Sequence, residues 1–259
     1  MSELSGKVAL ITGSNRGIGR AIAKRLAADG ARVVLCARDQ TLLDEAADEI
    51  RGDGGEALAI AADLRVPESG GQVVAAAVAR FGGLDIVVNC AGATKRGDFL
   101  TLTDDDWMDG YALKLFGAVR VTRAAWPYLK ARKGAVVNIS GSGGRTPGPQ
   151  FTIGGSVNAA LLSLTKALAD LGLQDGVQVN AINPGPVRTA RFEKRLAQTA
   201  AEHGVERDAA MEIFLREEKI TMVGEPEDIA GLIAFILSKN GRYIHGSLID
   251  ADGGSTKTI

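Results

Sequence analysis

Residues 7–19 read KVALITGSNRGIG, an aliphatic and β-branched run that leads without a break into a turn containing three glycines. The residues that follow, 18–28, carry apolar side chains at helical spacing. A strand, a glycine-rich turn and a helix in this order form the first half of a βαβ unit. Glycine suits such a turn because the chain bends tightly and the helix packs close to the strand.

The same turn is a predicted anion site. Backbone N–H groups at the start of a helix have no partner within the helix, and the helix dipole is positive there, so a phosphate can bind. A glycine pattern alone is weak evidence, but its place between a strand and a helix is typical of a dinucleotide pyrophosphate site. The predicted contacts come from Gly13, Ser14, Asn15, Arg16, Gly17, Ile18 and Gly19.

The alternation of strand-like and helix-like segments continues to the end of the chain. Short apolar runs predict strands at 7–12, 32–36, 57–61, 85–89, 135–140, 178–183 and 247–250. Longer amphipathic segments predict helices at 18–28, 40–51, 67–80, 103–132, 156–171 and 226–237. Strands covered by helices on both faces are expected to be almost continuously apolar, as these are. The pattern predicts a Rossmann-type α/β fold: a doubly wound parallel sheet of about seven strands with helices on both faces, in a single domain over 1–259.

Segment 188–222 departs from this alternation because it is charged and predicted to be helical. It follows the sixth strand, at the edge where open α/β sheets bind ligands, so it is a candidate substrate lid. Two interpretations of its charges remain open. Arg188, Arg191 and Arg195, with Lys194 beside them, form either a basic stripe for an anionic substrate group or a solvated helix face balanced by Glu212, Glu217 and Glu218.

Composition excludes several classes of function. With 46% apolar and 24% charged residues and a net charge of −1, the chain has the make-up of a globular protein without a field that attracts nucleic acid or an acidic membrane. Cys36 and Cys90 are isolated and predicted to be buried, reduced thiols, and the two histidines have no metal-ligand spacing, so no metal is expected. No apolar stretch approaches the roughly 20 residues of a membrane helix, and we expect a cytoplasmic protein.

Blocks of sequence spread over nearly the whole chain carry a family resemblance. Gly13-x3-Gly17-x-Gly19, Asn89-Cys90-Ala91-Gly92, Asn183-Pro184-Gly185, Gly224-Glu225-Pro226 and Asp252-Gly253-Gly254 resemble the short-chain dehydrogenase/reductase (SDR) superfamily. The resemblance implies an NAD(P)(H)-dependent oxidoreductase that acts on a small molecule. It further implies that Asp63 and Leu64 flank the adenine, that Asn89, Ala91 and Gly92 support the adenosine ribose, and that Pro184, Gly185, Val187 and Thr189 hold the nicotinamide.

The end of the second strand indicates which cofactor binds. A carboxylate there would bind the ribose 2′-hydroxyl and repel a 2′-phosphate. The strand instead ends in Arg38, and the first carboxylate, Asp39, comes one residue later. Arg38 and Arg16 together predict a 2′-phosphate site, so NADP(H) is favoured over NAD(H). The alternative is that both arginines are solvated surface residues.

The catalytic positions that the resemblance implies hold unusual residues. SDR enzymes use a tyrosine, a lysine four residues later, a serine thirteen residues before the tyrosine, and an asparagine on the preceding long helix. Matched to those motifs, the four positions are Gly154, Asn158, Gly141 and Lys114. None of the three tyrosines has a lysine four or seven residues downstream, so no shift of register restores the usual pair. We therefore expect a divergent member without the usual catalytic set.

The asparagine position holds Lys114 and the lysine position holds Asn158, so the two residue types are exchanged. The hypothesis is that Lys114 enters the same cluster from the opposite wall, with Asn158 as its neutral partner. There it would bind the ribose hydroxyls and serve as the general acid, if burial lowers its pKa. The alternative is a helix lysine that extends into solvent.

Other hydroxyl groups near these positions are weaker candidates. Ser142 follows the serine position, and Ser156 is expected to cap the helix that contains Asn158. Tyr111 and Thr152 are expected to have packing roles. Phe151 beside Gly154 and Gly155 predicts an active-site pocket that is wider than usual.

Three functions are compatible with these residues. The first is an NADP(H)-dependent carbonyl/alcohol oxidoreductase with an atypical catalytic site. The second is a non-catalytic NADP(H)-binding sensor or partner subunit, and the third is reduction of a C=C bond on the same scaffold. The resemblance also implies a homo-oligomer, a tetramer or a dimer.

Overall fold

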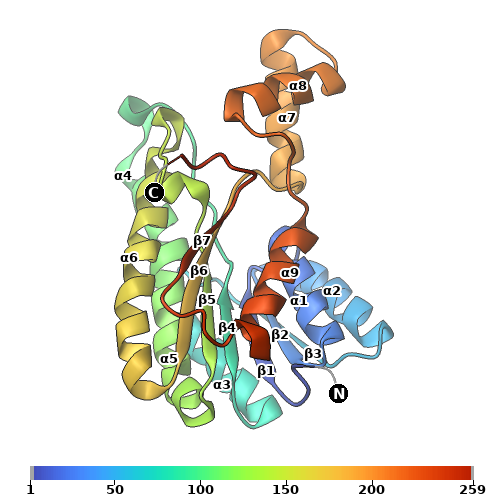
Figure 1. Cartoon of the computed structure of the whole chain (residues 1–259), viewed down its shortest axis with the longest axis vertical. Helices are drawn as coiled ribbons and strands as arrows, with labels where there is room; N and C mark the ends of the chain where they lie inside the picture. The colour runs from blue at the N-terminus through green and yellow to red at the C-terminus, as the bar shows by residue number, and fades with distance from the viewer. Residues whose placement is uncertain (1–2, 258–259) are drawn as a thin grey trace.

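The computed structural model describes residues 3–257 and contains a parallel sheet of seven strands in the order β3-β2-β1-β4-β5-β6-β7 (Figure 1). The strands are β1 (Val8–Thr12), β2 (Arg32–Ala37), β3 (Ala57–Ala61), β4 (Ile86–Asn89), β5 (Ala135–Ile139), β6 (Gln178–Pro184) and β7 (Leu248–Ala251). The chain winds outward from β1 to β3, then returns past β1 to β4. The order reverses between β1 and β4, which is where open α/β sheets bind ligands. The predicted doubly wound sheet is confirmed.

Helices cover both faces of the sheet (Figure 1). On one face, α1 (Gly17–Ala28), α2 (Gln40–Gly52) and α9 (Pro226–Leu237) pack against alternate strand residues such as Ala9 and Ile11. On the other face, α3 (Ser69–Phe81), α5 (Gly117–Arg132) and α6 (Thr152–Asp175) pack against the intervening residues, Val8 and Leu10 among them. The alternation arises because successive strand side chains point to opposite faces, and every residue of β1, β4 and β5 is buried.

The predicted helix at 103–132 is interrupted. It consists of α4 (Asp104–Tyr111), a π-helical turn (Ala112–Phe116) and α5. Thr103 begins α4 with a capping box, in which its hydroxyl accepts the N–H of Asp106 and the Asp106 carboxylate accepts the N–H of Thr103. A π-helical turn inside an α-helix is rare and often marks a functional site. Lys114 lies in this turn.

Helix α6 begins four residues before the predicted start at 156, and this corrects the proposed role of Ser156. The serine lies in the second turn of the helix, where its hydroxyl donates to the carbonyl oxygen of Ile153 at 3.0 Å and caps nothing. The early start follows from Ile153 and Val157, which are four residues apart and both buried.

The predicted helical segment 188–222 forms α7 (Ala190–His203) and α8 (Arg207–Glu218), which project beyond the carboxyl edge of the sheet (Figure 1). The two helices share a small core of their own, made of Phe192, Leu196, Ala210, Phe214, Ile220 and Val223. Within this core, the rings of Phe192 and Phe214 pack edge to face with centroids 5.2 Å apart. Among residues 3–257, no helix combines the length and the apolar character needed to span a bilayer.

Candidate functional site

The glycine turn between β1 and α1 is held tightly against the end of β4. Gly13 and Gly17 adopt left-handed backbone conformations, with φ of +69° and +54°. A Cβ on Gly13 would lie 2.9 Å from the Cα of Ala91, and one on Gly19 would collide with the carbonyl oxygen of Gly13. These positions therefore admit only glycine without a shift of the backbone.

The start of α1 is open to an anion. Within residues 3–257 no side chain caps the helix, and no carboxylate lies in its first turn. The first N–H groups of the helix are thus left for another acceptor, and the helix dipole adds positive potential. This donor set fits the pyrophosphate of a dinucleotide.

Two hydroxyl groups of the turn are used in building it. Buried Ser14 donates to the carbonyl oxygen of Ile11 at 2.8 Å and accepts the N–H of Cys36 at 3.0 Å. The hydroxyl of Thr12 accepts the N–H groups of Cys90 and Ala91, both at 3.0 Å. They fix the end of β1 to β2 and to the β4 loop, so they shape the site rather than line it.

The side chain of Asn89 also helps to build the site through hydrogen bonds. Its side-chain amide donates to Asn138 at 2.8 Å and to Thr122 at 2.9 Å, and Asn138 in turn donates to Thr165 at 2.9 Å. All four side chains are buried. The chain of bonds joins β4 and β5 to α5 and α6 directly below the cofactor edge, because a buried polar group needs a partner.

The residues at the end of β2 leave positive charge exposed. Arg16 and Arg38 are exposed, and within residues 3–257 neither forms an ion pair. The carboxylate of Asp39 accepts the N–H of Leu42 at 3.1 Å and so serves as the cap of α2. The Asp63 carboxylate is held by Arg65. The acidic group nearest Arg38 in sequence is thus engaged in capping a helix.

The far side of the site comes from the end of β6, where Pro184 pairs with β7. A Cβ on Gly185 would lie 2.7 Å from the Cα of Asp252, and Val187 pairs with Gly224 in an isolated bridge. Thr189 caps α7 by accepting the N–H of Phe192 at 3.4 Å. Its methyl group lies 3.2 Å from a Cβ position on Gly17. The fold therefore brings residues from both ends of the chain to one edge.

Lys114 reaches this edge from the π-helical turn. Its ammonium donates to the carbonyl oxygen of Ser140 at 2.6 Å and to Oδ1 of Asn158. Its aliphatic stem passes Gly92, where a Cβ would lie 3.0 Å from Cδ of the lysine. The lysine therefore does not extend into solvent, and it meets the asparagine that was expected to be its partner.

The surroundings of Lys114 lower the pKa of its ammonium group. Removal from water, and secondly the positive charge of Arg191, lower the pKa of Lys114 to about 8. Cys90 lies close by, and burial raises the pKa of its thiol to about 11. The amine therefore titrates in a range where it can both release and take up a proton at moderate pH, whereas the thiol stays protonated.

Phe151 corrects the prediction of a wide pocket. A Cβ placed on Gly154 would collide with the Phe151 ring, and one on Gly143 would lie 3.0 Å from it. The ring therefore fills the space that the missing side chain at 154 leaves. Opposite, a Cβ on Gly141 would lie 2.9 Å from Nδ2 of Asn158, so the amide of this asparagine occupies the room beside that glycine.

Among the described residues, none of the remaining hydroxyl candidates forms a hydrogen bond with the Lys114 ammonium. Ser142 is partly buried and begins a short 3-10 turn, in which its carbonyl oxygen accepts the N–H of Arg145. Tyr111 stacks on Trp107 with ring centroids 6.5 Å apart. The Thr152 hydroxyl is buried without a partner among the described residues.

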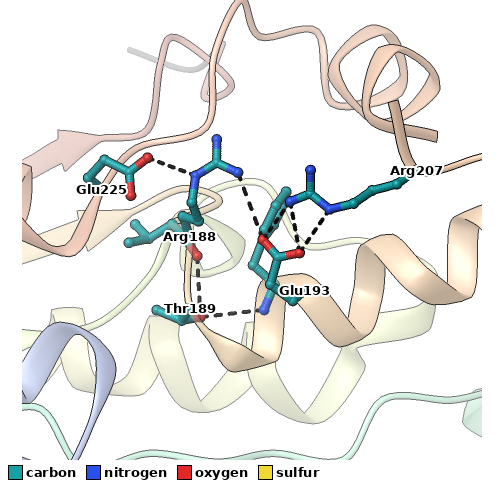
Figure 2. A network of polar contacts seen from close by, with 7 residues as sticks. Arg188, Thr189, Glu193, Arg207 and Glu225 are labelled. Carbon is teal, nitrogen blue, oxygen red and sulfur yellow. Dashed lines mark hydrogen bonds and ion pairs between the residues drawn. The ribbon is translucent and has the colours of Figure 1, made fainter. Parts of the chain in front are cut away.

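A network of ion pairs holds the base of α7 and α8 (Figure 2). Arg188 bonds Glu225 at 2.8 Å and lies 3.8 Å from Glu193, and Glu193 also accepts from Arg207 at 2.9 Å. One carboxylate thus links the start of α7 with the start of α8 and, through Arg188, with the cap of α9. These pairs are partly solvated, so each contributes little stability alone.

Known proteins resemble this chain over its full length. A sequence model of the enoyl-(acyl carrier protein) reductase family matches residues 13–256. An uncharacterized oxidoreductase of Mycobacterium tuberculosis is 38% identical over 258 residues, which cover 99% of this chain and 94% of that protein. The human dehydrogenase/reductase SDR family member 4 is 34% identical over 258 residues, covering 99% and 90%. The crystal structure of L-sorbose reductase from Gluconobacter frateurii, complexed with NADPH and L-sorbose, matches with a TM-score of 0.95 at 34% identity, covering 100% of both chains. The chain belongs to the SDR superfamily.

Three features of this SDR site were not predicted from the sequence. They are the π-helical turn that carries Lys114, the ring of Phe151 beside Gly154, and the position of Arg96, whose guanidinium lies 4.0 Å from the centre of that ring. The glycines at 154 and 155 gave a hint of the second, because they open room for a neighbouring side chain. The other two depend on contacts between distant segments.

Proposed function

We propose that this SDR oxidoreductase interconverts carbonyl and alcohol groups of a small molecule with NADP(H), and that Lys114 replaces the usual tyrosine as proton donor and acceptor. The observation that carries the proposal is the Lys114 ammonium, bonded to Ser140 and Asn158 at the cofactor edge. Gly92, one of the cofactor residues expected from the sequence, lies against the stem of this lysine. By the family resemblance, the four usual catalytic positions correspond to Gly141, Gly154, Asn158 and Lys114.

The choice of NADP(H) is supported by the exposed charges at the end of β2. Arg16 and Arg38 are available for a 2′-phosphate because both are exposed and neither forms an ion pair among residues 3–257, while Asp39 caps α2. A phosphate binds well between two guanidinium groups, each of which offers two parallel N–H donors. The matching L-sorbose reductase is itself complexed with NADPH. The pyrophosphate would lie at the open start of α1, beside Gly13 and Gly19.

When bound, NADPH supplies the hydride that adds to the carbonyl carbon. The protein has to bind the oxygen and give it a proton. An ammonium group has three N–H donors, and two of those of Lys114 are bonded to Ser140 and Asn158. The third is left for the substrate oxygen or a ribose hydroxyl. Proton transfer leaves Lys114 as a neutral amine, which regains its proton from water.

Asn158 and Ser140 have positioning roles in this proposal. Asn158 is buried, its Oδ1 faces Lys114, and its carbonyl oxygen accepts from the Ser140 hydroxyl at 3.0 Å. Both acceptors for Lys114 are therefore fixed in place by the same local network. A fixed donor geometry reduces the reorganisation that proton transfer requires.

The segment 188–222 is proposed as the substrate lid. It projects over the carboxyl edge of the sheet, and Arg191 joins it to the loop after β4 through the carbonyl oxygen of Gly92 at 2.9 Å. A homo-oligomer is also proposed. Several large apolar side chains around α4 and α5 are exposed, among them Phe99, Leu100, Met108 and Phe116.

The deciding experiment compares NADPH binding with turnover on panels of carbonyl and conjugated C=C compounds, for the wild type, Lys114→Met and Lys239→Met. We expect Lys114→Met to bind NADPH and to lose about 10²–10⁴-fold in carbonyl reduction, since that is the usual contribution of a general acid. Lys239 is exposed and remote, so its substitution is the control. Tight NADPH binding without turnover on either panel would establish the sensor or partner-subunit function instead. Turnover restricted to C=C compounds would establish the third function.

A further inference from the structure

Three arginines lie near one another where the loop after β4 faces α7. Arg96 lies in the loop after β4, and Arg191 and Arg195 lie one turn apart on α7. Arg191 donates to the carbonyl oxygen of Gly92, next to the stem of Lys114. The charges act on one another: the pKa of Arg96 is lowered by partial removal from water and then by the charges of Arg195 and Arg191, with Glu218 opposing. The loop wall and the lid therefore present like charges to one region.

The arginines of this cluster are less well compensated than others of the same segment. Arg188 and Arg207 both bond carboxylates within the lid network (Figure 2). Arg195 pairs with Glu218 on α8. Among residues 3–257, no carboxylate forms an ion pair with Arg96 or Arg191. Glu218 is one carboxylate among three arginines, so positive charge remains in excess, and an anion that binds between Arg96 and Arg191 is stabilised.

Arg96 is supported by the same ring that fills the space at Gly154. Its guanidinium lies over the face of Phe151 at 4.0 Å, a cation–π contact. The ring occupies this place because residue 154 has no side chain. The absence of a side chain at 154 is thus linked physically to the position of the Arg96 guanidinium.

We propose that Arg96 and Arg191, flanked by Arg195, bind an anionic oxygen group, a carboxylate or a phosphate, that the substrate carries in addition to its carbonyl. The inference rests on the proposed function, because it names the class of substrate for the same site. Guanidinium groups recognise such anions through paired N–H donors. The net charge of the whole chain is −1, so the attraction comes from this cluster and not from the overall field.

The test is a calorimetric titration of the protein, with and without NADP⁺, using levulinate, methyl levulinate and inorganic phosphate as probes. We expect levulinate to bind at least about 10-fold more tightly than its uncharged ester, since hydrogen bonds to a charged group are the stronger ones. The double variant Arg96→Gln/Arg191→Gln should lose this preference and keep its affinity for NADP⁺. The matched control is Arg216→Gln, which removes an exposed lid arginine on α8 that forms no ion pair among residues 3–257, and it should leave the preference unchanged.

Phosphate adds a further comparison. Competition between phosphate and levulinate would include phosphorylated substrates in the class, and lack of competition would restrict it to carboxylates; both results support the site. The proposed anion site would be overturned by equal affinity for levulinate and its ester, or by no binding of any probe. It would also be overturned if the double variant lost affinity for NADP⁺ but bound levulinate unchanged. Because binding is measured without turnover, an anion preference in a protein that reduces no carbonyl would refute the proposed function and leave the anion site standing.

Discussion

Lys114 illustrates how a single side chain acquires its chemistry from two opposing effects. Burial disfavours the ammonium and lowers its pKa to about 8, whereas the carbonyl oxygen of Ser140 and the amide oxygen of Asn158 hold the charged form in place. The amine therefore stays protonated at neutral pH. It loses its proton near pH 8, below the ordinary lysine pKa of 10.5. A group in this range can serve in both directions of a reversible reaction.

The pH dependence of turnover follows from that value. The protonated amine is the acid for reduction, so the rate of reduction should be constant below about pH 8 and fall about tenfold per unit above it. Oxidation of the alcohol needs the neutral amine, so its rate should rise through the same pH. Steady-state kcat measured against pH in both directions checks this. In Lys114→Arg the change of slope near pH 8 should disappear from both profiles, because a guanidinium does not titrate near pH 8. A change of slope that persists in Lys114→Arg would assign the proton to another group.

A second prediction at the residue scale concerns Gly154. Because the Phe151 ring occupies the space beside it, Gly154→Tyr should lower the free energy of unfolding by roughly 1–3 kcal/mol, as overpacking does. Gly154→Tyr/Phe151→Ala should recover part of that loss. Gly148, which has open space around its Cβ position, is the control, and Gly148→Tyr should be nearly neutral. Urea unfolding measures all three, and equal stabilities of the 148 and 154 variants would contradict the packing seen here.

The same residues show how far the sequence could predict the site. Lys114 and Asn158 were predicted as partners because family spacing placed both, and the structure joins them by a hydrogen bond. Phe151 was predicted to leave a wide pocket, and this was wrong. The rotamer of a ring depends on which neighbours leave room for it, and that information lies in the tertiary contacts with Gly154 and Gly143.

At the scale of elements, the strands and helices were predicted well and the junctions between helices were not. The strands are mainly apolar runs that alternate with amphipathic segments, and their ends lie within two residues of the predicted ones. The π-helical turn at Ala112–Phe116 has no signature in the sequence because its residues are ordinary helix formers. Its consequence is functional, since an extra residue in the turn changes where Lys114 points.

The lid gives a prediction at this scale. Glu193 connects the first turn of α7 with Arg188 and Arg207 (Figure 2), so Glu193→Gln should release α8 from the base of α9. We expect faster amide hydrogen exchange in α7 and α8 and a change of no more than about 1 kcal/mol in the free energy of unfolding of the whole protein, since the pairs are partly solvated. Glu202→Gln on the same helix, where the carboxylate bonds only Gln198, is the control. Unchanged exchange in α8 of the Glu193 variant would show that the small apolar core alone holds the lid.

At the scale of the whole molecule, the order of the strands makes one site from segments far apart in the sequence. The reversal between β1 and β4 brings the glycine turn beside the loop at Gly92, and the end of β6 adds Gly185 and Thr189 from the far side. A dinucleotide bound along this edge would contact segments that separate on unfolding. Binding should therefore stabilise the entire fold rather than one element.

Thermal unfolding can then distinguish the two cofactors. A ligand that binds only the native state raises its stability by about 2.7 kcal/mol at a concentration 100 times its dissociation constant, so NADPH should raise the melting temperature by several degrees. NADH at the same concentration should raise it less, because it lacks the phosphate that Arg16 and Arg38 are placed to bind. In Arg38→Ala the ratio of the NADPH and NADH affinities should fall by about tenfold. The control is Arg242→Ala, which removes an exposed arginine bonded only to the carbonyl oxygen of Lys239 and should leave this ratio unchanged. Equal shifts with both cofactors in the wild type would mean that the exposed arginines at the end of β2 are solvated surface residues, and the preference for NADP(H) would have to be abandoned.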